Sequence, residues 1–175
     1  MKTISLTQPW ASLIALGAKR FETRSWAPRH RGLLAIHAAK GFPPSCKRIC
    51  LVEPFLSALG KEHIQGMTPG RLDGGGLVHT LPLGAVLGVV ELVGCVETQK
   101  IRDGISDFKA GVRPEAPISP QEYAFGDYSS GRFAWELRLL KRFEVPVPMN
   151  GALGLWECPG DLLLEWTAAK ENHNG

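Results

Sequence analysis

One short segment gathers ionisable side chains in a pattern suited to catalysis or to ligand binding. Lys19, Glu22 and Arg24 lie close together in the sequence. Alternation over residues 20–26 predicts a strand, and one face of it carries Glu22, Arg24 and Trp26. An ammonium group can stabilise developing negative charge, and a carboxylate can move a proton or activate water. The segment is therefore a candidate hydrolytic site, with an ordinary ion pair between neighbouring strands as the alternative.

A second carboxylate stands in an apolar stretch. Glu91 is the only charged residue within 85–96, which is otherwise rich in valine and leucine and predicts a buried strand. An unpaired carboxylate there would cost several kcal/mol or would hold a proton. Glu91 therefore either faces solvent or has a cationic partner, for which Lys19 and Arg24 are the best candidates. With such a partner, Glu91 is a candidate general base toward water.

Aromatic rings flank the basic residues of the first segment. Trp10 precedes them, Trp26 ends the predicted strand, and Arg29 and Arg31 follow. Cations that hold phosphate and flat rings that stack bases are typical of sites for single-stranded nucleic acid or nucleosides. Lys19, Arg24, Arg29 and Arg31 are therefore expected to meet phosphates. Trp26 is a candidate to stack a base, whereas Trp10 either joins it or packs a helix onto the core.

The charge of the chain is unevenly distributed. Residues 1–48 hold nine Lys and Arg against one acidic residue, although the formal net charge of the whole chain is only +3. Such asymmetry indicates a surface that faces a polyanion, or else a solvated basic face balanced by acids folded against it. The partner expected from the residues alone is a single-stranded nucleic acid or a nucleoside.

Length and composition describe a folded domain. The chain has 175 residues, of which 44% are hydrophobic and 21% charged, so neither a disordered tail nor a fibrous repeat is indicated. No apolar run approaches the roughly 20 residues needed to span a bilayer. The N-terminal residues also lack the pattern of a signal peptide. We therefore expect a cytoplasmic protein with no membrane partner.

Several common catalytic and cofactor motifs are missing. The three glycines at 74–76 lack the ending of a phosphate-binding loop, and no serine stands in a Gly-x-Ser-x-Gly elbow. The four cysteines are too scattered for a disulfide framework or a zinc site, so we expect them to be reduced and mostly buried. His37, alone in an apolar stretch, is expected to be a core residue. No metal and no cofactor are predicted.

The order of the predicted elements indicates the fold class. Short strands, few helices and many glycines favour an α+β fold, a mixed β-rich barrel with peripheral helices, over a parallel sheet. Strands are expected at 3–6, 20–26, 33–39, 85–96 and 132–148 with a last one starting near 155, and helices at 8–17, 44–60 and 161–170. Residues 1–170 are expected to form a single domain, in which 60–84 and 110–130 are candidate insertions, followed by a frayed tail at 171–175.

Three stretches of the chain form a recognisable pattern. They are Gln8-Pro9-Trp10-Ala11-Ser12-Leu13, then Gly17-x-Lys19-x-x-Glu22-x-Arg24-Ser25-Trp26 with His30-Arg31-Gly32, and finally Arg132-Phe133-Ala134-Trp135-Glu136 with Gly151-x-x-Gly154-Leu155-Trp156. In these residues the chain resembles the ASCH domain family, the activating signal cointegrator homology domains. The resemblance covers both ends and most of the chain, with weaker support between residues 60 and 130.

The resemblance implies a PUA-like fold, a small β-barrel of mixed sheet surrounded by helices. It also implies a cleft that such families use for RNA, and sometimes for modified nucleosides or DNA, so the expected partner is single-stranded RNA or a modified nucleoside, with DNA as an alternative. Some small bacterial relatives are amidohydrolases that remove acetyl from acetylcytidine with a lysine, a threonine and a glutamate. Lys19 matches that lysine and Glu91 that glutamate, whereas Glu22 stands at the position of the threonine. Water would then replace the hydroxyl nucleophile. A single-strand ribonuclease and an interaction module without catalysis also stay open, because a fold does not fix a function.

Overall fold

The structure is a computed structural model that describes residues 1–60, 80–102 and 118–159. Its strands are β1 (Lys2–Leu6), β2 (Phe21–Arg24), β3 (Gly32–Ala38), β4 (Ala85–Glu97), β5 (Phe133–Pro148) and β6 (Leu155–Glu157). Its helices are α1 (Trp10–Ala15), α2 (Pro44–Ile49), α3 (Phe55–Leu59), α4 (Thr98–Arg102) and α5 (Pro120–Ala124). None of the described helices is long and apolar enough to cross a membrane.

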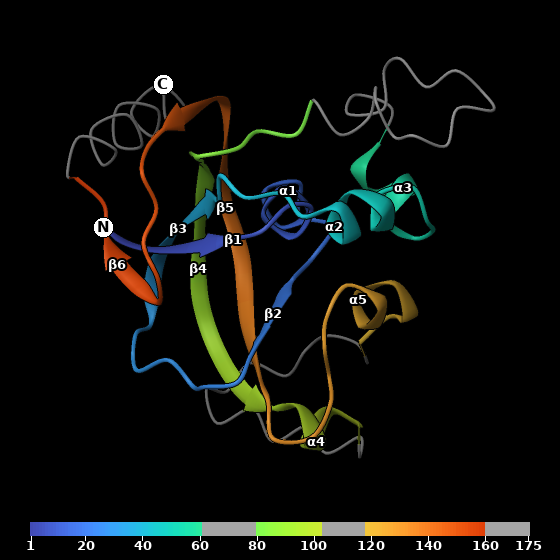
Figure 1. Ribbon diagram of the computed structural model, residues 1–175. Coiled ribbons are helices and arrows are strands. Elements are labelled where there is room, and N and C mark those ends of the chain that lie inside the picture. Colours follow the sequence, from blue (N-terminus) through green and yellow to red (C-terminus); the bar gives the residue numbers. More distant parts are fainter. Residues whose placement is uncertain (61–79, 103–117, 160–175) are drawn as a thin grey trace, which may run out of the picture.

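The described strands form one mixed sheet in the order β2-β5-β4-β3-β1-β6. The β1–β3 pair is parallel, and the other pairs are antiparallel. In Figure 1 the long strands β4 and β5 curve together and β2 lies to the right of them. Helices α1, α2, α3 and α5 lie on that same side of the sheet, and α4 lies at its lower end. Register shifts along β4 and β5 add the local bending that lets the sheet curl. The result is a half-barrel with short peripheral helices, as the sequence predicts.

The inner face of the curled sheet holds the main core. Trp135 on β5 is fully buried there beside Val90 and Leu92 of β4. Helix α1 packs on the same cluster through Ile14, while its opposite side meets a second cluster. That second cluster includes Phe125, the residue that follows α5. Helix α1 therefore lies between the sheet and the segment after α5, which fixes the position of the residue at its start.

Most predicted elements occur within a few residues of their expected places. The second predicted helix is divided into α2 and α3, and Pro54 precedes α3. Pro146 and Pro148 are tolerated in β5 because β2 pairs only with its first part, residues 133–136, so the distal part lacks a second partner strand among the described residues. The helix expected at 161–170, the tail and the glycines at 74–76 lie outside the described residues.

Candidate functional site

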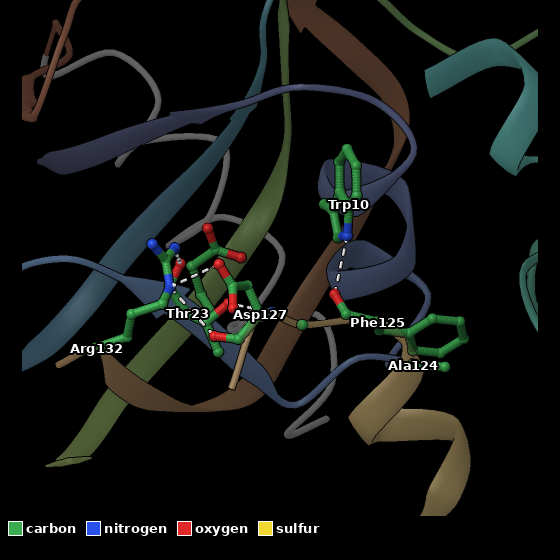
Figure 2. A pocket seen from close by; sticks show the side chains of 8 residues that line it. Trp10, Thr23, Ala124, Phe125, Asp127 and Arg132 are labelled. Atoms are coloured by element: carbon green, nitrogen blue, oxygen red, sulfur yellow. Dashed lines mark hydrogen bonds and ion pairs between the residues drawn. The ribbon is translucent and has the colours of Figure 1, made fainter. Parts of the chain in front are cut away.

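A cavity of about 300 Å³ lies beside β2, the strand at one edge of the sheet. It is lined by Trp10, Glu22, Thr23, Ala124, Phe125, Gly126, Asp127 and Arg132. In Figure 2 the indole of Trp10 stands on one side, and Thr23, Asp127 and Arg132 stand on the other. Ligand cavities in proteins span about 300–1,000 Å³. This cavity is at the lower limit, which suits one nucleobase or nucleoside rather than a larger ligand.

Trp10 forms one wall of the cavity and is anchored from behind. It opens α1, and its Nε1 donates to the carbonyl oxygen of Phe125 at 2.8 Å. Its ring also meets Phe55 edge-on at a centroid distance of 6.3 Å. The indole is half-buried, so it packs on the core and still lines the cavity. The packing of Trp10 against the core is therefore observed, and its role in stacking a base stays a prediction.

Lys19 lies behind this wall instead of lining the cavity. Its side chain is fully buried, and Nζ donates to the same Phe125 carbonyl at 2.9 Å. Nζ also lies 4.0 Å from Oε1 of Glu122. Burial lowers the pKa of Lys19, while the charges of Glu22 and Glu122 oppose that effect. In this arrangement Lys19 positions the cavity wall, and a catalytic role for it stays a prediction.

Glu122 is a site residue that sequence reasoning missed. Its carboxylate accepts backbone N–H groups of Arg20 at 2.7 Å and Phe21 at 3.1 Å. Burial raises the pKa of Glu122, and these hydrogen bonds and the nearby lysine charge counteract part of the rise. Ser119 caps α5 by accepting the N–H of Glu122 at 3.1 Å. A Ser-Pro-x-Glu sequence predicts such a helix start, but it does not reveal that the glutamate accepts hydrogen bonds from the backbone at the start of β2, about a hundred residues earlier in the chain.

Glu22 brings a carboxylate to the cavity from β2. Its Oε1 lies 3.0 Å from Nε of Arg24, so the residues predicted to share a strand face form an ion pair. Nη2 of Arg24 also donates a hydrogen bond to the carbonyl oxygen of Ser5 on β1 at 3.4 Å, and this bond links the edge strand β2 to β1. The second oxygen, Oε2 of Glu22, makes no hydrogen bond with any residue that the structure describes. This oxygen is therefore available to accept a donor from a ligand.

A polar network forms the opposite wall. Arg132 pairs with Asp127, with Nε 3.2 Å from Oδ2, and its Nη2 donates to the carbonyl oxygen of Thr23 at 3.1 Å. The N–H of Asp127 donates to Oγ1 of Thr23 at 2.9 Å. Hydrogen bonds from Ser129 lower the pKa of Asp127. Sequence reasoning missed the role of Asp127, because an aspartate in a turn carries no signal of which strand it will meet.

Trp26, Arg29 and Arg31 lie on the connection from β2 to β3, outside the cavity. Trp26 is 37% exposed and meets the buried Trp135 edge-on, with centroids 4.6 Å apart. Trp135 is also the residue opposite Glu22 in the β2–β5 register. Both arginines are exposed, and Arg31 donates to two carbonyl groups of its own loop. The exposed indole of Trp26 therefore lies close to β2, the strand that carries Glu22.

The expected pairing of Glu91 with Lys19 or Arg24 is wrong. Glu91 pairs with Arg138, its neighbour across the β4–β5 register. Successive side chains of a strand point to opposite faces, and the adjacent Leu92 belongs to the core on the inner face. Glu91 is therefore on the outer face, the alternative that the sequence left open. The role of Glu91 as a general base stays a prediction. The two groups proposed for catalysis have different partners, since Glu91 pairs with Arg138 and Lys19 contacts the Phe125 carbonyl and Glu122.

Other sequence predictions concern buried or metal-binding residues. His37 is buried, and its Nε2 hydrogen-bonds to the carbonyl oxygen of Met149 at 3.0 Å, so its prediction as a core residue is confirmed. The four cysteines are free, with Cys50 and Cys158 buried and the other two half-buried. Within the described ranges, no group of three or more His, Cys, Asp or Glu side chains is arranged to hold a metal ion.

Comparison with known proteins identifies the family. The profile of the ASCH domain matches residues 4–147, which is most of the chain. The chain belongs to the ASCH domain family. Similar proteins include Activating signal cointegrator 1 of Mus musculus, at 32% identity, and of Homo sapiens, at 31% identity, each over 104 residues. These matches cover 59% of this ASCH chain but only 16% of each relative, so it corresponds to a small part of those proteins.

Proposed function

We propose that this ASCH domain binds single-stranded RNA, with one base in the cavity beside Trp10 and Glu22 and another base on Trp26. The observation that carries the proposal is the cavity itself, where an indole and a carboxylate face a space of about 300 Å³. An aromatic face together with hydrogen-bonding groups is the means by which proteins hold unstacked bases. The exposed indole of Trp26 offers a second stacking surface nearby.

The charges favour a base, rather than a phosphate, inside the cavity. Glu22 and Asp127 both line it, and a phosphate there would meet two carboxylates. Cations lie around it instead: Arg132 on its wall, Arg24 beside Glu22, and Arg29 on the exposed connection that follows. A base directed inward would leave its phosphates outside, where arginines can meet them. An arrangement with carboxylates inside the cavity and arginines around it agrees with the excess of Lys and Arg over acidic residues in residues 1–48.

The test is a titration of fluorescein-labelled RNA with purified protein, followed by fluorescence anisotropy at several salt concentrations. Contacts with about three phosphates of a single strand should give a slope of log K against log salt of about −2. We expect Trp26→Ala to weaken binding by about 1–3 kcal/mol, the contribution of one stacked base. Leu153→Ala is the control, because Leu153 is 99% exposed and lies outside the site. Affinity that is independent of salt and unchanged by Trp26→Ala would contradict the proposal.

The hydrolase alternative is tested separately. Mass spectrometry of acetylcytidine, and of a short RNA that contains it, detects loss of the acetyl group or strand scission. Lys19 is engaged by the Phe125 carbonyl and Glu91 by Arg138, so no observed arrangement favours turnover over binding. We expect both substrates to stay intact. Turnover that is abolished by Lys19→Ala would instead support an enzyme and would contradict a function in binding alone.

A further inference from the structure

We infer that the cavity selects guanine, through hydrogen bonds from the Watson–Crick edge of the base to the carboxylate of Glu22. The inference rests on the proposed function and names the base that the cavity accepts. Its starting point is the unused acceptor, Oε2 of Glu22, in a side chain that lines the cavity and is only 11% exposed. Oε2 is accessible from the cavity, and a ligand that covers it without offering a matching donor leaves it unpaired, which is the basis of strong discrimination.

The arrangement of donors on the bases decides which base fits. Guanine presents two adjacent donors, N1–H and the N2 amino group, and a carboxylate can accept both in a bidentate, charge-assisted contact. Adenine and cytosine each place a ring-nitrogen acceptor beside their amino group, which would face the second carboxylate oxygen. Uracil has one N–H between two carbonyl oxygens, and both oxygens would be repelled. A carboxylate therefore matches guanine better than the other three bases.

The rest of the cavity agrees with this choice. Guanine carries an acceptor, O6, next to N1–H, and Arg132 supplies a guanidinium group to the same cavity. Nε and Nη2 of Arg132 are used by Asp127 and Thr23, whereas Nη1 makes no hydrogen bond within the described part of the chain. The indole of Trp10 offers a surface for the purine ring. Donors, acceptors and an aromatic wall thus occur together in one cavity.

The experiment compares oligonucleotides that differ at one base. The probes are fluorescein-labelled uridine octamers whose fourth base is uracil, guanine, adenine, cytosine or inosine, titrated at fixed low salt. A bidentate contact discriminates between bases by about 1–3 kcal/mol, so the guanine octamer should bind about 5- to 150-fold more tightly than the uracil octamer. Inosine lacks only the N2 amino group and should bind with intermediate affinity. A 7-deazaguanine octamer keeps the Watson–Crick edge and should bind like guanine.

A variant of Glu22 tests the same contact from the side of the protein, because it replaces one acceptor by a donor. Glu22→Gln replaces the two acceptor oxygens by one acceptor and one donor, which matches the edges of adenine and cytosine. We expect the variant to lose its preference for guanine and to gain affinity for adenine or cytosine relative to wild type. Glu97→Gln, at an exposed acid at the end of β4, should leave the order of affinities unchanged.

The outcomes separate the inference from the proposed function. Binding of all octamers with equal affinity, with inosine equal to guanine, would overturn the choice of guanine and leave RNA binding intact. Absence of binding to every octamer would overturn the proposed function, and the inference with it. Because inosine changes the RNA and not the protein, the test remains decisive even where Glu22→Gln fails to fold.

Discussion

Replacement of Lys19 by methionine tests whether this lysine supports the cavity wall. The side chain of Lys19 is fully buried and that of Glu122 is 8% exposed, so solvent screens their interaction little. Removal of one partner from a buried ion pair costs about 3–5 kcal/mol, because the other charge is left without compensation. Glu122 keeps its two backbone hydrogen bonds, and the Phe125 carbonyl keeps the bond from Trp10. We therefore expect Lys19→Met to cost about 3 kcal/mol, the lower end of that range.

Urea unfolding followed by tryptophan fluorescence measures this cost for Lys19→Met, Glu122→Gln and the double variant. Lys19→Met removes the lysine charge from Glu122, and Glu122→Gln leaves Lys19 with only the more distant charge of Glu22, whereas the double variant removes both members of the pair. The double variant should therefore be less destabilised than the sum of the single variants, with a coupling energy of about 1–3 kcal/mol. A loss below about 1 kcal/mol for Lys19→Met, or strictly additive effects, would show that the lysine is not a structural support.

Three further predictions concern stability and reactivity. Burial raises the pKa of the Glu122 carboxyl above its ordinary value of 4.5, so its ionisation costs more in the folded than in the unfolded protein and stability falls as the pH rises from that value through the pKa of the folded state. Urea unfolding at pH 5 and pH 7 should therefore show a smaller loss of stability for Glu122→Gln than for wild type. Gly88→Ala places a methyl group against the backbone of β5 and should cost about 1–3 kcal/mol by the same measurement, whereas Gly41→Ala meets nothing within 4 Å and should be neutral. Burial raises the pKa of the Cys50 thiol to about 11, so mass spectrometry after brief iodoacetamide treatment at pH 8 should find Cys46 alkylated first.

Local patterns in the sequence predicted the part of the site that depends on neighbouring residues. The alternation along residues 20–26 placed Glu22 and Arg24 on one strand face, and they form an ion pair at 3.0 Å. Proline near the start of the first helix and glycine after its end also predicted α1, which carries Trp10. The shared face follows from the two-residue period of a strand, and the ends of the helix follow from the backbone preferences of proline and glycine. Both can be recognised in the sequence without knowledge of the fold.

The contacts between distant segments could not be derived in the same way. The sequence contains Glu122, but nothing in it indicates that this carboxylate caps the backbone of Arg20 and Phe21. The composition of β4 led to the wrong partner for Glu91 for a related reason. Its first half is buried throughout, whereas over residues 91–96 half-buried and buried residues alternate. A uniformly apolar composition does not distinguish a strand covered on both faces from one covered on a single face.

The division between Lys19 and Glu22 explains how one scaffold can serve different chemistry. Lys19 and Trp10 both donate to the Phe125 carbonyl, at 2.9 and 2.8 Å, and neither of these hydrogen bonds is made by the side chain at position 22. The position matched to a threonine nucleophile in the amidohydrolase relatives carries an acceptor of hydrogen bonds here. Because a carboxylate accepts donors and repels phosphate, this exchange favours recognition of a base over attack on an acyl group. Under the proposed function, the residue at position 22 therefore decides what the cavity binds, within a wall to which Lys19 and Trp10 both donate hydrogen bonds.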